Sequence, residues 1–435
     1  MIAARLSRAL AMHGVHFGWV VAATTFFTML VSAGAVGAPG LFLVPWEREF
    51  GWAPAQISFA LAVRFLLYGL MGPFAAALMN RCGVRRIVIS ALLLVTAGLL
   101  TSLAMHRLWQ LVLLWGVVVG VGTGLTAMVL GATVATRWFS SRRGLVIGML
   151  SASTATGQLV FLPVLARLTQ QHGWRYALSG VCAMLIAATL LGLLLLRDRP
   201  REVGLEPYGE TAGSPPAVTA PPAHATAAAP LAVLREAART RVFWVLFGTF
   251  FICGASTNGL VQTHFVALCG DYGLAAVGAA GVLAMMGVFD FGGTIFSGWL
   301  SDRFDNRWLL AWYYALRGLS LLCLPLAHFT FGGLTPFAVF YGLDWIATVP
   351  PTVRLTADRF GPERANIVFG WVFAGHQMGA AAAAYGAGLT RTVSGSYLPA
   401  FMASGLLCIV ATIVVLTLPR GRQPARPGTR LQTQW

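Results

Sequence analysis

Twelve apolar segments, each long enough to cross a lipid bilayer, dominate this sequence of 435 residues. A membrane-spanning helix needs about 20 predominantly apolar residues. Segments of that length fall at residues 17–44, 54–78, 84–105, 108–136, 142–168, 174–196, 241–269, 275–300, 308–329, 334–357, 366–390 and 396–418. The chain is 57% hydrophobic and only 10% charged, whereas soluble globular chains carry about 25% charged residues. We therefore expect an all-α membrane protein with twelve transmembrane helices.

The charged residues predict how these helices are oriented. The net charge of +16 does not indicate nucleic-acid binding, because the arginines lie in short clusters between apolar segments and form no single basic patch. They concentrate in alternate loops, in the central segment and in the C-terminal tail. By the positive-inside rule, both termini and the central segment are expected in the cytoplasm, with the protein in the inner membrane of a bacterial cell. The six cysteines have no metal-binding spacing, and we expect no metal, cofactor or disulfide framework.

The two halves of the sequence match each other at an offset of 222 residues. The stretch "LMNRCGVRR" aligns with "LSDRFDNRW", which pairs Asn80 with Asp302 and Arg81 with Arg303. A parallel repeat of this size is typical of one class of transporter built from two pseudo-symmetric six-helix bundles.

The repeat predicts where the domains begin and end. We expect bundles at residues 1–196 and 241–418, a cytoplasmic linker at 197–240 and a cytoplasmic tail at 419–435. The linker contains the Pro- and Ala-rich stretch "TAGSPPAVTAPPAHATAAAP", which predicts a disordered tether. The stretch "LAVLREAARTR" that follows predicts a short amphipathic helix.

The loop between the second and third spans of each half resembles the G-x-L-a-D-r-x-G-r-r motif of the major facilitator superfamily. The first copy has Asn80 and Arg81, without the usual acid, and the second has Asp302 and Arg303. The resemblance implies that this loop braces a cytoplasmic gate. An acid at that point can meet the positive end of a neighbouring helix or a nearby arginine.

Within that superfamily, the chain resembles the monocarboxylate porter and oxalate/formate antiporter branch. The stretches that carry the resemblance are "GLFLVPWEREFGWAPAQIS", "RWFSSRRGLVIGMLSASTATGQ", "GWRYAL" and "RDRPREVGLEPYG". The chain departs from the branch on its eighth helix, where Thr294 stands at the position of an arginine that contacts substrate carboxylate, four residues after Asp290. The motifs of proton-coupled drug exporters are absent from the fourth and fifth helices.

Five ionisable residues interrupt the apolar segments, and such residues are costly at bilayer depth unless they are paired or face water. Arg317 and Asp344 lie at similar depth on neighbouring helices, and we expect them to form a structural ion pair. Asp290 is the competing partner for Arg317. If Asp344 instead faces the cavity that the resemblance implies, its loss would stop transport without preventing folding.

Arg64 and His376 are the leading candidates for contact with substrate. Arg64 either pairs across the cavity with one of the acids or awaits an anionic substrate, whose carboxylate its guanidinium can bind with two parallel hydrogen bonds. His376 stands where the resemblance implies a cationic residue or a histidine. It either contacts substrate and couples protons together with Asp290, or is a neutral histidine hydrogen-bonded between helices.

Weaker candidates for the substrate-binding site are polar side chains in other spans. Asn258 and Gln158 either line the site or join helices to one another. Tyr68 and Tyr385 either line the cavity or pack in the core.

The tenth helix contains the pair Pro350–Pro351, which would free backbone carbonyls and bend the helix.

These observations predict a monomeric secondary transporter that moves a small organic anion, a monocarboxylate, by alternating access. A proton or a counter-anion would be its coupling partner. The alternative is an exporter or antiporter of cationic or amphiphilic compounds, with the membrane acids as cation sites. A sensor built on the same fold is another alternative, but the sequence shows no additional signalling domain. No P-loop, catalytic nucleophile with its base, or metal motif indicates an enzyme.

Overall fold

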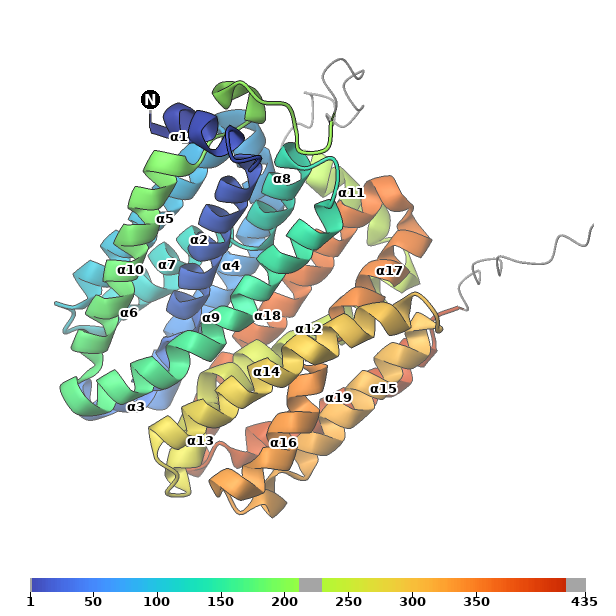
Figure 1. Cartoon of the computed structure of the whole chain (residues 1–435). Coiled ribbons are helices and arrows are strands. Elements are labelled where there is room, and N and C mark those ends of the chain that lie inside the picture. Colours follow the sequence, from blue (N-terminus) through green and yellow to red (C-terminus); the bar gives the residue numbers. More distant parts are fainter. Residues whose placement is uncertain (1, 211–228, 420–435) are drawn as a thin grey trace, which may run out of the picture.

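The computed structural model describes residues 2–210 and 229–419, which are almost entirely helical (Figure 1). The one strand-like feature in these ranges is an isolated bridge between Phe139 and Tyr208. An amphipathic N-terminal helix, α1 (Ile2–Ala11), precedes the first span. The expected all-α fold is confirmed.

The first six spans follow one another with short connections. They are α2 (Gly18–Gly37) continued by α3 (Pro39–Phe50); α4 (Pro54–Cys82); α5 (Val84–Ser102); α6 (Leu108–Leu111) continued by the π-helical η1 (Val112–Val118), α7 (Val119–Leu125) and α8 (Met128–Trp138); α9 (Arg143–His172); and α10 (Trp174–Leu195). Each span is long because its residues are apolar and a helix satisfies every backbone polar group within itself.

The last six spans repeat this order. They are α12 (Arg241–Gly254) continued by the π-helical η3 (Ala255–Val261) and α13 (Gln262–Asp271); α14 (Ala276–Ser301); α15 (Asn306–Leu322), followed by the 3-10 turn η4 (Leu324–Ala327); α16 (Phe331–Asp344) followed by α17 (Val349–Phe360); α18 (Pro362–Ser394); and α19 (Leu398–Leu416). Nine helical segments in the described ranges are long and apolar enough to cross a membrane. The other three of the twelve spans are α9, α15 and the interrupted pair α16–α17.

The internal repeat seen in the sequence recurs in the helix boundaries. α4 and α14 begin at Pro54 and Ala276, and α5 and α15 begin at Val84 and Asn306, so both pairs keep the 222-residue offset. The surface of the bundles carries many exposed apolar side chains, for example Ile295, Trp312 and Ile413. Such a surface is unfavourable in water but suits contact with lipid chains.

The two bundles meet along two helix pairs, and the repeat relates one pair to the other. α4 of the first bundle packs along α18 of the second, and α9 packs along α14; α3 also meets α13. Close approach depends on small residues: a Cβ added to Gly40 of α3 would lie 2.6 Å from the backbone oxygen of Gln262. Small residues let helix backbones approach closely within a membrane.

The central segment contributes short helices at one end of the molecule, called here the linker end, where α1 also lies (Figure 1). They are η2 (Pro200–Val203) and α11 (Ala229–Ala237). α11 docks on α18, because Trp371 Nε1 donates to the Pro230 oxygen at 2.9 Å and Arg364 pairs with Glu236 at 2.6 Å. It corresponds to the amphipathic helix expected from the sequence. Residues 211–228, most of the expected disordered tether, lie outside the described residues.

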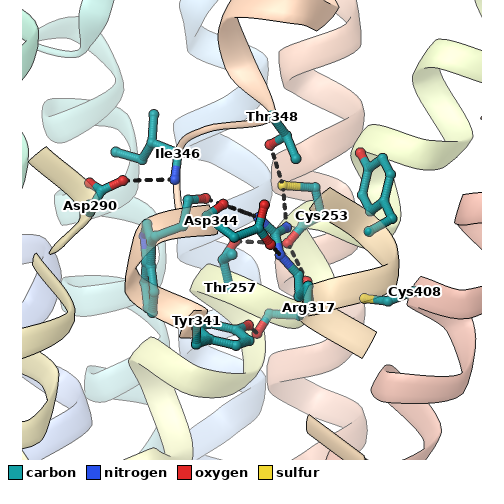
Figure 2. A network of polar contacts seen from close by, with 12 residues as sticks. Cys253, Thr257, Asp290, Arg317, Tyr341, Asp344, Ile346, Thr348 and Cys408 are labelled. Atoms are coloured by element: carbon teal, nitrogen blue, oxygen red, sulfur yellow. Dashed lines mark hydrogen bonds and ion pairs between the residues drawn. The ribbon is translucent and has the colours of Figure 1, made fainter. Parts of the chain in front are cut away.

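The interior of the second bundle contains an ion pair between Arg317 of α15 and Asp344 at the end of α16 (Figure 2). Arg317 Nε donates to Asp344 Oδ2 at 2.7 Å, and the arginine side chain has no exposed surface. Arg317 Nη1 also lies 2.8 Å from Cys253 Sγ. The structure thus brings together the two residues expected to pair, deep between helices and without access to water.

Removing one partner of this pair should destabilise the fold. In Asp344→Asn the guanidinium of Arg317 stays buried without a counter-charge, a loss that typically costs about 3–5 kcal/mol. We expect a lower thermal unfolding midpoint and poor recovery of the variant from detergent. Asp302→Asn is the matched control, because it breaks an exposed pair with Arg354 and should shift the midpoint little. Equal midpoints for the two variants would contradict a structural role for the buried pair.

Glycine contacts offer a second test of the packing. A Cβ at Gly379 of α18 would overlap the carbonyl oxygen of Phe251 on α12, whereas a Cβ at Gly386 on the same helix would meet nothing within 4 Å. Overpacking typically costs about 1–3 kcal/mol, so Gly379→Ala should unfold at lower temperature than the unaltered protein. Gly386→Ala should unfold at the same or higher temperature, because alanine favours the helix. The measurement is thermal unfolding in one detergent for both variants.

Candidate functional site

A buried cation lies on α4, the helix that packs along α18 of the second bundle. Arg64 of α4 is only 2% exposed, and its Nη1 donates to the backbone oxygen of Val36, near the end of α2, at 2.8 Å. Its guanidinium lies 4.6 Å from the ring centre of Phe65. Arg64 forms no ion pair with a described residue, so neither of the acids considered for it, Asp290 or Asp344, is its partner here. Its Nε is buried without a hydrogen-bond partner.

A buried amide, that of Gln262, lies beside the junction between α2 and α3. Gln262, the first residue of α13, follows the π-helical turn η3. Its side chain is next to Gly37, because a Cβ on that glycine would lie 3.8 Å from Gln262 Nε2. Both polar atoms of the amide are buried and unpartnered among the described residues. Arg64 and Gln262 therefore border the same short stretch of chain, Val36 and Gly37.

Gln262 and Asp290 line a common cavity of about 10 Å³. The remaining lining is apolar and comes from Leu162, Leu283, Met286, Gly287 and Trp345. The volume suits roughly one water molecule. The cavity is lined by α9 of the first bundle and by α13 and α14 of the second.

Asp290 is tied to the interruption of the tenth span (Figure 2). Its Oδ1 accepts a hydrogen bond from the backbone N–H of Ile346 at 2.9 Å and another from Thr294 Oγ1 at 3.0 Å. Thr294, at the position where the resemblance implies an arginine, thus binds the acid four residues before it. The bend expected before Pro350 and Pro351 is present as a break at residues 345–348 between α16 and α17.

His376 lies among aromatic rings on the side of α18 that faces α12. Its ring centre is 4.9 Å from that of Phe250 and 5.6 Å from that of Phe373, and the second pair is stacked. His376 Nδ1 is buried without a hydrogen-bond partner among the described residues. No described hydrogen bond joins His376 to Asp290, so the two residues expected to act together in coupling occupy separate surroundings.

The next residue, Gln377, faces α4 instead. A Cβ on Gly69 of α4 would lie 2.5 Å from the Cβ of Gln377, and Gln377 Oε1 is buried without a described partner. Sequence reasoning missed Gln262 and Gln377, although each places a polar amide inside an apolar segment. An amide inside an apolar segment is the same signal that points to Gln158 and Asn258, and it would have found these two residues as well.

The weaker candidates are dispersed. Tyr68 is half-buried, with its ring centre 6.3 Å from that of Phe373 across the α4–α18 contact. Tyr385 is 41% exposed and packs edge-on against the exposed Phe59. Asn258 lies within η3, where its backbone oxygen accepts a hydrogen bond from Thr263 Oγ1 at 2.7 Å. The side chain of Gln158 lies outside the described residues.

The loops predicted to form the gate lie at the linker end, where α4 and α14 finish. Asp302 Oδ1 accepts a hydrogen bond from Arg354 Nη1 at 3.1 Å, which connects the end of α14 to α17. Arg303 stacks over the ring of Trp299 at 4.1 Å. Arg81 is exposed, and the side chain of Asn80 lies outside the described residues.

In the first bundle a different acid stands near the gate loop. Asp198, just beyond α10, accepts a hydrogen bond from the backbone N–H of Arg85 at 2.8 Å, at the start of α5. Sequence reasoning missed it because Asp198 comes from another part of the chain. A carboxylate at a helix N-terminus is favourable because the free N–H groups there carry partial positive charge.

Taken together, the described residues near the contact between the bundles provide a cation with an unpartnered Nε, on Arg64, and unpartnered amide atoms on Gln262 and Gln377. No group of three or more potential metal ligands exists among the described residues. The arrangement is suited to binding a polar or anionic molecule reversibly between two bundles.

The chain matches the Major Facilitator Superfamily over residues 25–384. It is 26% identical to monocarboxylate transporter 13 of Rattus norvegicus over 406 residues, which cover 93% of this chain and 89% of the relative. It is 29% identical to monocarboxylate transporter 11 of Homo sapiens over 425 residues, covering 94% and 85%. The structure also resembles that of a D-xylose–proton symporter, with a TM-score of 0.71 at 14% identity, covering 93% of this chain and 99% of the symporter.

The expected resemblance is thus confirmed by an independent comparison of both sequence and fold. The match spans both bundles and the contact between them, where the candidate residues lie. This chain belongs to the major facilitator superfamily and is a multi-pass membrane transporter, not an enzyme.

Proposed function

We propose that this transporter carries a small organic anion, a monocarboxylate, by alternating access. The observation that carries the proposal is Arg64, a buried cation at the contact between the bundles that has no acidic partner among the described residues. A charge at bilayer depth is costly unless it is paired or faces water. An anionic substrate would provide the missing counter-charge.

The free edge of Arg64 has the geometry that a carboxylate needs. Its Nη1 is engaged with the Val36 oxygen, while Nε is unpartnered. The edge formed by Nε and Nη2 can therefore donate two parallel hydrogen bonds to the two oxygens of one carboxylate. The nearby amide of Gln262 offers a donor and an acceptor for another polar atom of the substrate.

The relatives support the same substrate class. Two of them are named as monocarboxylate transporters, and the match covers more than nine-tenths of this chain. The substitution of Thr294 for an arginine on α14 means that this chain needs its substrate cation elsewhere, and Arg64 on α4 meets that need.

Proton coupling is part of the proposal. Asp290 borders the cavity beside Gln262, and His376 has an unpartnered nitrogen in the adjoining α18. Either group can gain or lose a proton as the site opens and closes to water. Exchange against a counter-anion is the alternative form of coupling.

For the arrangement in the cell, we propose that the linker end faces the cytoplasm of a bacterium, with bundles at 1–196 and 241–418 joined by 197–240, and a tail at 419–435. The arginine distribution supports this orientation. The pair of Asp302 and Arg354 would then belong to the cytoplasmic gate. A transporter of cationic compounds is less well supported, because Asp344 is paired with Arg317 and Asp290 binds Ile346 and Thr294.

Arg64 provides the direct test of the anion site. In Arg64→Ala, loss of the charge-assisted hydrogen bonds should weaken carboxylate binding by about ten- to a hundredfold. Arg64→Lys should retain part of the affinity, because an ammonium supplies charge without the two-pronged geometry. The measurements are uptake of radiolabelled small carboxylates into proteoliposomes and ligand-induced thermal shifts of the purified protein.

Arg107→Ala is the matched control, because Arg107 is exposed in a short loop. It should leave both uptake and thermal shifts unchanged. Carboxylate uptake by Arg64→Ala equal to that of the unaltered protein would rule out the anion site. Uptake of an organic cation, inhibited in Asp290→Ala, would favour the cation exporter instead.

A further inference from the structure

The tenth span is interrupted at a point where every freed backbone group needs a partner. α16 ends at Asp344 and α17 begins at Val349, and Pro350 and Pro351 follow in the first turn of α17. Prolines have no N–H, so they cannot bond the carbonyls one turn earlier. In a membrane, unpaired backbone groups of this kind are tolerated only when other protein groups or water satisfy them.

Side chains of α14 bind two of the freed groups. Asp290 Oδ1 accepts the hydrogen bond of the Ile346 N–H at 2.9 Å, and Ser297 Oγ donates to the Ala347 oxygen at 2.5 Å. Residues 290 and 297 are seven apart, about two helical turns, so they lie on the same face of α14. That face therefore binds two consecutive residues of the break, Ile346 and Ala347.

Arg317 of α15 binds two further carbonyls of the break. Its Nη2 donates to the oxygens of Asp344 at 2.6 Å and of Trp345 at 3.2 Å, in addition to the ion pair with the Asp344 carboxylate (Figure 2). The break also contacts α12, where Cys253 Sγ lies 3.3 Å from Thr348 Oγ1, so it is held from three neighbouring helices.

On the N-terminal side of the break, α16 packs closely against α14 through glycines. A Cβ on Gly342 would lie 2.5 Å from the Met286 oxygen, and a Cβ on Gly293 would overlap the Leu343 oxygen. Beyond the break, the only described ion pair between α17 and α14 is the one from Arg354 to Asp302, whose side chains are 45% and 66% exposed. Exposed pairs of this kind contribute little and separate readily. Relative to α14, α17 is therefore held by buried hydrogen bonds at the break and by an exposed ion pair toward its other end, where Arg359 also donates to the Pro419 oxygen.

We infer that Asp290 and Ser297 are positioning residues that hold the break of the tenth span against α14, so that α17 pivots there while the linker end opens and closes. This inference rests on the proposed transport function, but it concerns the rate of the conformational change and not substrate binding. The role of Asp290 here requires only its Oδ1 as a hydrogen-bond acceptor. An asparagine at that position retains such an acceptor.

Two readouts test the inference on the full-length protein. The first is hydrogen–deuterium exchange of residues 345–360 in the absence of substrate, which reports whether the break is held. The second is the rate of carboxylate exchange across proteoliposomes at saturating and subsaturating concentration, which separates the maximal rate from KM. The variants are Asp290→Ala, Asp290→Asn and Ser297→Ala. Ser301→Ala is the matched control, because Ser301 is also on α14 but its hydroxyl donates to Asn306 Oδ1 at the start of α15, at 2.5 Å, and not to the break.

We expect faster deuterium uptake at 345–360 and an approximately tenfold lower maximal exchange rate, with little change in KM, in Asp290→Ala and Ser297→Ala. Asp290→Asn should lose less of the exchange rate than Asp290→Ala, because it can still accept the Ile346 N–H. Ser301→Ala should match the unaltered protein in both readouts. If Asp290→Ala fails to fold, the inference is tested by comparing deuterium uptake at 345–360 and the maximal exchange rate between Ser297→Ala and Ser301→Ala.

Unchanged deuterium uptake at 345–360 in both test variants would overturn the inference, and so would faster uptake without a slower exchange rate. An increase in KM at an unaltered maximal rate would also overturn it, because that result assigns the residues to substrate binding. If the unaltered protein exchanges no carboxylate, the proposed substrate class fails, and deuterium uptake alone then decides whether the two residues hold the break.

Discussion

The second bundle depends on the contacts that the buried guanidinium of Arg317 makes. One side chain neutralises Asp344 and binds the carbonyls of Asp344 and Trp345, so it holds both a charge and a break in the backbone. An unpaired charge and an unsatisfied break in the backbone are each costly at this depth. Each makes the other possible. The pair also removes Asp344 from the set of groups available to a substrate.

The consequence is an asymmetry between two bundles that share one framework. Two pairs of helices, α4 with α14 and α5 with α15, begin 222 residues apart, but the buried Arg317 of the second bundle is neutralised and the buried Arg64 of the first is not. Arg64 binds only a backbone oxygen among the described residues. The proposed site between the bundles would thus be positive on the side of the first bundle. The proposed binding of an anion follows from this difference, and the proposed pivot lies on the opposite, neutralised side.

Much of the framework could be predicted from the sequence because it depends on local pattern. The length of each apolar segment predicted the spans, the arginine clusters predicted alternate loops, and two opposite charges at equal depth on neighbouring helices predicted the pairing of Arg317 with Asp344. The contacts of Asp290 could not be predicted in this way. Its partner is a backbone N–H released by a break in another helix, and sequence spacing within α14 gives no information about that group.

The sequence by itself determined a membrane protein of two repeated bundles, because the hydrophobic effect and the need to satisfy every backbone group leave few alternatives for such apolar segments. It also determined which charged residues interrupt the apolar segments. Only the tertiary structure decided which of them face one another. Gln262 and Arg64 are about 200 residues apart in the chain, yet both border Val36 and Gly37. Contacts of that kind depend on how helices from both bundles pack, and packing is a property of the whole chain.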